Sequence, residues 1–163
     1  VWGLCPIFLI AQMLFAMSGS TLLCISYRDH YVATDDPDTI RATFATAPAI
    51  RSHVNNLVSE IIGTFVLVFA VLYITGPTMG DESGSLGSLD ALPVALVVLG
   101  IGLGLGGPTG YAINPARDLG PRLMHFILPL PHKRDSDWGY SWIPVVGPCI
   151  GGLLAALLFL QLA

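Results

Sequence analysis

The residues with the clearest chemistry form one short run, Asn114-Pro115-Ala116-Arg117. Asparagine is among the best N-cap residues and proline is favoured at the first helical position, so the run predicts a helix that begins at Pro115. The free N–H groups and aligned peptide dipoles of a helix start concentrate about half a positive charge there. Arg117 adds a permanent charge and a fixed fork of donors. Such a site repels cations and hydrated protons while it accepts neutral, hydrogen-bonding solutes.

A glycine-rich segment precedes this helix start and stays strongly apolar. Its helix-breaking residues are Gly100, Gly102, Gly104, Gly106, Gly107, Pro108 and Gly110. Non-helical backbone at membrane depth is tolerated only where protein buries it or where it lines a wet cavity. The stretch from Pro115 to Leu128 would be about 21 Å long as a helix, which crosses only part of a bilayer core of roughly 30 Å. We therefore expect a re-entrant loop and half-helix over about 107–128, with several backbone carbonyls exposed in a row.

The patterns that would indicate an enzyme or a bound cofactor fail. Gly102-x-Gly104-x-x-Gly107 satisfies the dinucleotide pattern by letter, but no strand precedes it and no acidic residue follows about 20 residues on. The histidines are scattered, and the three cysteines lie in apolar stretches without metal-ligand spacing. No Ser-His-Asp order or paired carboxylate suggests catalysis. We predict no enzyme, no cofactor and no metal site.

The elements that must position the site are apolar and almost free of charge. Hydrophobic residues make up 53% of the 163 residues and charged residues 11%, against roughly 25% charged residues in ordinary globular chains. Four apolar stretches approach the length of about 20 residues that crosses a bilayer, at about 3–26, 55–75, 91–106 and 141–163. We expect an all-α polytopic membrane protein embedded in the lipid bilayer. A net charge of −4 without a basic stripe excludes a nucleic-acid-binding protein.

Glu60 is the only acidic residue inside the four predicted spans. Its partner could be Arg117, or the unpaired N–H groups of the segment from Gly100 to Gly110. We favour the N–H groups, because a buried carboxylate that accepts backbone hydrogen bonds makes an irregular loop rigid. A plain polar contact with a neighbouring helix stays open as a third reading.

These residues together resemble a known family. The run from Gly110 to Arg122 resembles the second Asn-Pro-Ala signature of the major intrinsic proteins, and most closely that of the glycerol facilitators, the aquaglyceroporin branch. Glu60-x-x-x-Thr64-Phe65 resembles the motif of the family's fourth helix, and Gly147-Pro148-x-x-Gly151 resembles its last helix. The resemblance covers residues 1–163 as one partial aquaporin-like domain, from the third helix to the sixth. It implies a right-handed helical bundle with one re-entrant half-helix and with the first half-repeat largely absent.

The resemblance also implies roles for single residues. Asn114, which opens the signature with Pro115 and Ala116, would donate its side-chain amide to a solute at the midpoint of a pore. Arg117 would be the arginine of the selectivity filter and would hold solute hydroxyl groups.

Three further positions are typical of a glycerol channel rather than of a strict water channel. Tyr111 would form one aromatic wall of the filter, Gly102 would widen it by having no side chain, and Asp118 follows the arginine as in glycerol channels. The carbonyls of Thr109, Gly110, Tyr111 and Ala112 would form the ladder of acceptors, and Glu60 would support the loop.

The sequence therefore predicts a passive channel for glycerol and other small neutral solutes, with water as a co-permeant. The family implies a homotetramer, and the run 136–144 resembles bacterial members, which implies a multi-pass protein of the bacterial plasma membrane. Two other classes stay open at this stage. An ion-coupled secondary transporter would also have broken helices at mid-membrane but needs an ion-binding acid besides Glu60. A non-conducting scaffold, or a truncated half, would use the helices alone.

Overall fold

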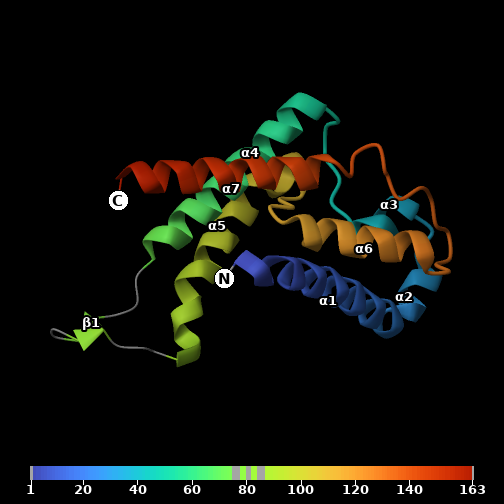
Figure 1. Ribbon diagram of the computed structural model, residues 1–163. Helices are drawn as coiled ribbons and strands as arrows, with labels where there is room; N and C mark the ends of the chain where they lie inside the picture. The colour runs from blue at the N-terminus through green and yellow to red at the C-terminus, as the bar shows by residue number, and fades with distance from the viewer. Residues whose placement is uncertain (1, 75–77, 80–81, 84–86, 163) are drawn as a thin grey trace.

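The structure is a computed structural model that describes residues 2–74, 78–79, 82–83 and 87–162. Four helices are long and apolar enough to cross a membrane: α1 (Cys5–Ser26), α4 (His53–Tyr73), α5 (Leu92–Thr109) together with the turn before it, and α7 (Ile143–Leu162). Their number is the four that the sequence predicts. Figure 1 shows α7 crossing α4, with the shorter α6 beside α1.

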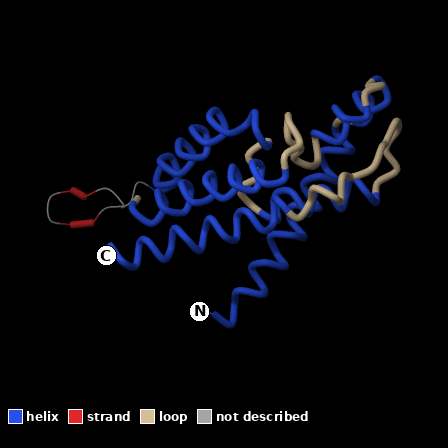
Figure 2. Tube along the Cα trace, turned by 90° about the horizontal axis from the view of Figure 1, so that it is seen from above, coloured by secondary structure: helices blue, strands red, loops and turns tan. Residues whose placement is uncertain are grey.

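The remaining described elements are short. They are the 3-10 helices η1 (Trp2–Leu4) and η2 (Gly87–Ala91), the helices α2 (Arg28–Ala33), α3 (Pro37–Ala42) and α6 (Pro115–Ile127), and the strands β1 (Thr78–Met79) and β2 (Glu82–Ser83). The two strands pair antiparallel, with Thr78 opposite Ser83. Figures 1 and 2 show this hairpin at one end of the helices, on the side of the C-terminus and far from α2 and α3.

The expectation that the glycine-rich segment interrupts the helix is wrong for most of its length. Helix α5 continues through Thr109, and Gly110, with φ of 76°, ends it as a left-handed C-cap. A glycine inside a helix costs only about 0.5–1 kcal/mol. An unpaired backbone group in hydrocarbon costs several kcal/mol, so the helical hydrogen bonds outweigh the glycine penalty. The non-helical part of the expected re-entrant loop over 107–128 is therefore confined to residues 110–114.

Close contact between α4 and α7 depends on two glycines of α7. A Cβ atom added to Gly147 would lie 2.6 Å from the Cβ of Glu60, and one added to Gly151 would lie 2.3 Å from the carbonyl oxygen of Ile61. No real side chain fits at such distances. Glycines four residues apart let two membrane helices approach to backbone contact, which is the common way to pack helices where lipid removes the hydrophobic driving force.

Helix α6 packs on α1 by a similar contact. A Cβ atom at Gly120 would lie 2.8 Å from the Cβ of Ala16 and 3.3 Å from the carbonyl oxygen of Met13. In contrast, large apolar side chains elsewhere on the long helices face outward, and Phe15 and Leu103 are 76% and 81% exposed. Apolar exteriors of this kind suit contact with lipid or with further protein.

Candidate functional site

Residues 110–114 join α5 to α6 in an unusual backbone conformation. We call this segment the pore loop, because the sequence predicts that it lines a pore. Tyr111 and Ile113 have positive φ angles of 39° and 44°. Positive φ is uncommon for any residue with a side chain, and for a β-branched residue such as isoleucine it is an outlier. Each such residue costs on the order of 1–3 kcal/mol and persists only where its surroundings hold it. The pore loop therefore needs an external support.

Glu60 of α4 supplies that support. Its Oε1 atom accepts a hydrogen bond from the N–H of Ala112 at 3.0 Å, and Oε2 accepts one from the N–H of Ile113 at 2.7 Å. The side chain is fully buried, with Gly147 of α7 against its Cβ atom. Of the partners considered from the sequence, the carboxylate contacts backbone N–H groups and not Arg117. The two groups lie just beyond the glycine-rich segment in which we expected them.

The start of α6 has the geometry of a capped helix. Asn114 is extended, and its Oδ1 accepts hydrogen bonds from the N–H groups of Ala116 at 2.9 Å and Arg117 at 3.3 Å. Pro115 occupies the first helical position, where its missing N–H is not needed. The Asn114 side chain is exposed, and among the described residues no hydrogen bond uses its Nδ2 group. That amide remains available as a donor.

Gly102, Tyr111 and Arg117 lie together although they come from three different elements. A Cβ atom at Gly102 would lie 3.1 Å from Cζ of the Tyr111 ring, so the tyrosine occupies the room that a side chain at position 102 would need. The guanidinium carbon of Arg117 lies 5.8 Å from the centre of the same ring. Arg117 is exposed, and no ion pair among the described residues involves it. Gly102 and Tyr111 also line an open groove of about 410 Å³ along α5.

The carbonyl groups of the pore loop complement these donors. Among the described residues, no hydrogen bond is accepted by the carbonyl oxygens of Thr109, Gly110, Tyr111 or Ala112. Gly110 and Tyr111 are partly exposed, whereas Ala112 and Thr109, the last residue of α5, are buried, so the acceptors beside the free amide of Asn114 belong to Gly110 and Tyr111. Donors and acceptors of both kinds lie within a few residues of a positively charged helix start, an arrangement suited to small polar, uncharged molecules.

A buried ion pair within α6 was not foreseen from the sequence. Asp118 and Arg122 are both fully buried, and Arg122 donates to the two carboxylate oxygens at 2.8 and 3.0 Å. The same guanidinium donates to the carbonyl oxygens of Thr46, Ser136 and Asp137. All five of its N–H donors are thereby used. The pair fastens α6 to the segment before α4 and to the segment before α7, and its only sequence signal is the Asp-to-Arg spacing of four residues.

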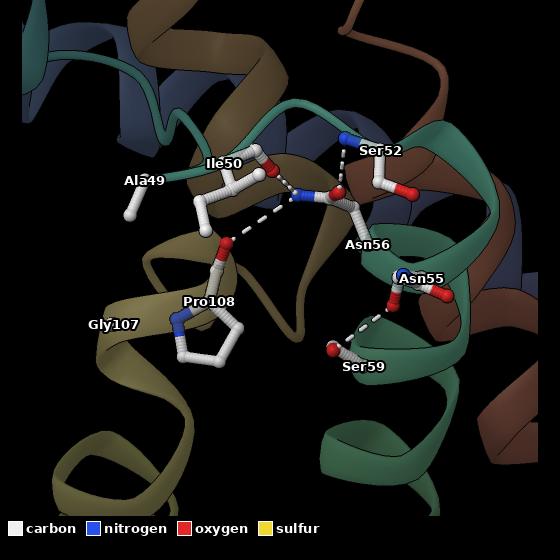
Figure 3. A pocket seen from close by; sticks show the side chains of 8 residues that line it. All are labelled: Ala49, Ile50, Ser52, Asn55, Asn56, Ser59, Gly107 and Pro108. Carbon is white, nitrogen blue, oxygen red and sulfur yellow. Dashed lines mark hydrogen bonds between the residues drawn. The ribbon is translucent and has the colours of Figure 1, made fainter.

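Two further contacts hold the segment 43–52, which leads into α4. Asn56 donates to the carbonyl oxygens of Ile50 and Pro108 at 3.3 Å each and accepts from the N–H of Ser52 at 2.9 Å. Figure 3 shows this amide between the end of α5 and the start of α4, beside a groove of about 360 Å³. An asparagine in an apolar span is the signal that could have identified it, since such residues act as polar contacts between membrane helices.

Arg51 and Asp137 form the second contact, an ion pair with two hydrogen bonds, one of them 2.9 Å long between Nη1 and Oδ1. Burial alone would raise the pKa of the Asp137 carboxyl group, but the Arg51 hydrogen bonds and positive charge lower it below its ordinary value of 3.8. The carboxylate is thus held in its charged form.

The fold combines helices of membrane length with a half-helix, α6, whose start is capped. A supported loop joins this half-helix to α5. Together these elements define a membrane channel fold built on a re-entrant segment. The family model described as "Major intrinsic protein" matches residues 4–159, and the chain belongs to that family. It is therefore a multi-pass membrane protein of a channel family and not an enzyme.

Curated relatives agree with this assignment. The chain is 51% identical over 158 residues to the probable glycerol uptake facilitator protein of Thermotoga maritima and 49% identical over 158 residues to the glycerol uptake facilitator protein of Streptococcus pneumoniae. Each alignment covers 97% of this chain and 65% of the relative. A D/L-lactic acid transporter of Lactiplantibacillus plantarum is 42% identical, with 95% and 64% covered. The chain thus spans about 65% of the length of these relatives.

A solved structure extends the likeness to three dimensions. The X-ray structure of the aquaglyceroporin from Plasmodium falciparum superimposes with a TM-score of 0.78 at 28% identity, covering 94% of this chain and 62% of that chain. The fold expected from the sequence and the resemblance to the glycerol facilitator branch are both confirmed.

Proposed function

We propose that this chain forms part of a passive channel for glycerol and other small neutral solutes, with water as a co-permeant. The observation that carries the proposal is the grouping of Gly102, Tyr111 and Arg117 around one ring. The Tyr111 ring, packed against Gly102, offers an apolar face to the carbon skeleton of a solute, and the exposed guanidinium provides two donors for adjacent hydroxyl groups. The printed names of the bacterial relatives support the same solute class.

Selection in this channel is electrostatic as well as steric. A neutral polyol replaces its hydrogen bonds to water with hydrogen bonds to the protein. The partners are the Arg117 donors, the Asn114 amide and the free carbonyls of the pore loop. A cation is repelled by the guanidinium charge of Arg117 and by the positive end of α6. We propose that the full channel works as a homotetramer in the bacterial plasma membrane, as the family resemblance implies.

A small organic acid in its neutral form is the second candidate solute. It is favoured by the 42% identity to the D/L-lactic acid transporter of Lactiplantibacillus plantarum. Such an acid offers a carbonyl and a hydroxyl group to the same donors. The second candidate shares the pore and differs only in the solute.

An ion-coupled transporter would need a buried carboxylate that can bind the coupling ion, and the buried carboxylates here are already bound to protein groups. Both oxygens of Glu60 accept hydrogen bonds from the pore loop, and Asp118 is paired with Arg122. Neither group has a free oxygen for a coupling ion. A passive mechanism therefore fits the described part of the chain.

The test is solute-driven reswelling of vesicles that contain the natural full-length protein. Glycerol and lactic acid are compared, each with and without sodium and proton gradients, and protein-free vesicles serve as the control. Glycerol flux that is independent of both gradients is expected. Flux that disappears without a gradient would refute the passive channel, and faster entry of lactic acid than of glycerol would favour the second candidate.

A further inference from the structure

Thr46 lies between two parts of the pore machinery. Its N–H and its hydroxyl group both donate to Oδ2 of Asp118, at 2.8 and 2.6 Å, and its carbonyl oxygen accepts from Arg122 at 2.9 Å. The residue is buried, although it belongs to the irregular segment 43–52 and not to a helix. Every polar atom of Thr46 is therefore bound to the buried ion pair of α6.

The other side of Thr46 contacts the pore loop. A Cβ atom added to Gly110, the first residue of that loop, would lie 3.2 Å from both Cβ and Cγ2 of Thr46. The threonine side chain thus rests on the glycine at the point where α5 ends with a left-handed turn. Asp118 is adjacent in sequence to Arg117, and Gly110 is adjacent to Tyr111. The two neighbours of Thr46 are bonded directly to the two proposed filter residues.

We infer that Thr46 is a positioning residue that sets the separation of Tyr111 and Arg117. The hydroxyl and amide groups fix Thr46 against Asp118, and its Cβ atom, which serine also has, limits how far Gly110 can move. The inference rests on the proposed function, because it concerns the width of the same filter. It also gives Asp118 a physical role, which is to bind the segment 43–52 and not to touch the solute.

The geometry separates two contributions of the side chain. Thr46→Val keeps the branched shape against Gly110 but removes the hydroxyl donor to Asp118. Thr46→Ser keeps that donor and removes the methyl group. Thr43→Val is the matched control, because the Thr43 hydroxyl contacts Tyr31 and the carbonyl of Ile40, away from the pore loop.

The experiment measures glycerol and water permeability of the natural full-length protein in vesicles, each divided by the amount of protein incorporated. In Thr46→Val, the ratio of glycerol to water permeability should fall about three- to tenfold, the range that one lost hydrogen bond supports. Glycerol must fit both filter residues at once, whereas water needs no such fit. Thr46→Ser should stay within about twofold of the wild type, and Thr43→Val should not differ from it.

The outcomes distinguish this inference from the proposed function. A wild-type protein without glycerol flux refutes the function, whatever the variants do. A conducting wild type whose ratio is unchanged in Thr46→Val overturns the inference, including the case in which only the amount of assembled protein falls. If Thr46→Val does not assemble, Thr46→Ala is compared with Thr46→Ser, and equal ratios in these two variants overturn the inference in the same way.

Discussion

Replacing Glu60 tests how strongly the pore loop depends on one buried carboxylate. Both oxygens accept backbone hydrogen bonds, from Ala112 and Ile113, and the loop holds Tyr111 and Ile113 at positive φ. In Glu60→Gln the side-chain carbonyl can still accept one bond, but the amide NH₂ group faces the second N–H, so one charge-assisted bond worth about 1.5–3 kcal/mol is lost. In Glu60→Leu both N–H groups remain buried and unpaired.

The expected cost of Glu60→Leu follows from these two groups. Each buried, unpaired N–H costs about 1–3 kcal/mol, so the two together cost about 2–6 kcal/mol. The strain of the two left-handed residues, on the order of 1–3 kcal/mol each, acts in the same direction. We therefore expect the leucine variant to release the loop and lose most of its glycerol flux, while the glutamine variant retains a reduced flux.

The assay combines flux per incorporated protein molecule with thermal unfolding of the detergent-solubilised, full-length protein. Thr64→Val is the matched control, because Thr64 is buried one helical turn further along α4 and its hydroxyl group has no hydrogen-bond partner among the described residues. Near-normal flux and unfolding temperature in both Glu60 variants would refute the reasoning and return Glu60 to a plain contact between helices.

Four further predictions concern the filter, its charge, the chain by itself and acid stability. Gly102→His combined with Tyr111→Cys should lower the ratio of glycerol to water permeability. In the wild type the Tyr111 ring fills the space beside position 102, and in the double variant the polar histidine ring would take the place of that apolar ring. An unchanged ratio contradicts the filter assignment. Arg117→Val should admit small cations or protons, measured as vesicle conductance, while neutral-solute flux persists; a stable protein without leakage would place the arginine outside the pore. The chain reconstituted by itself should conduct neither glycerol nor water above the lipid background, since it spans about 65% of its relatives; robust selective flux would show that copies of it can close a pore. Because the folded-state pKa of Asp137 is lowered, the stability from its pairing with Arg51 is present above a pH of about 4 and is lost as the pH falls through the lowered value. Asp137→Asn should flatten this acid limb in pH-dependent unfolding, and an unchanged limb would exclude the pair as its source.

The sequence by itself determined the features that depend on a few neighbouring residues. The membrane-length helices follow from uninterrupted apolar stretches, because lipid requires each segment to satisfy its own backbone groups. The start of α6 follows from Asn114 and Pro115, since an N-cap bond closes within three residues. The motif around these residues is also local, and it was sufficient to indicate the family.

Only the tertiary structure decided which distant groups meet. Glu60 reaches N–H groups 52 and 53 residues away, and Thr46 reaches Asp118 across 72 residues, although nothing in the spacing of these residues indicates a contact. Tertiary structure also settled the glycine-rich segment, which remains helical to Thr109 because its backbone hydrogen bonds outweigh the intrinsic preference of glycine. The physical reason is the same in each case. Helix capping and apolar length act within a turn or a span, whereas a buried carboxylate takes whichever donors the packing of α4, α6 and α7 brings within reach.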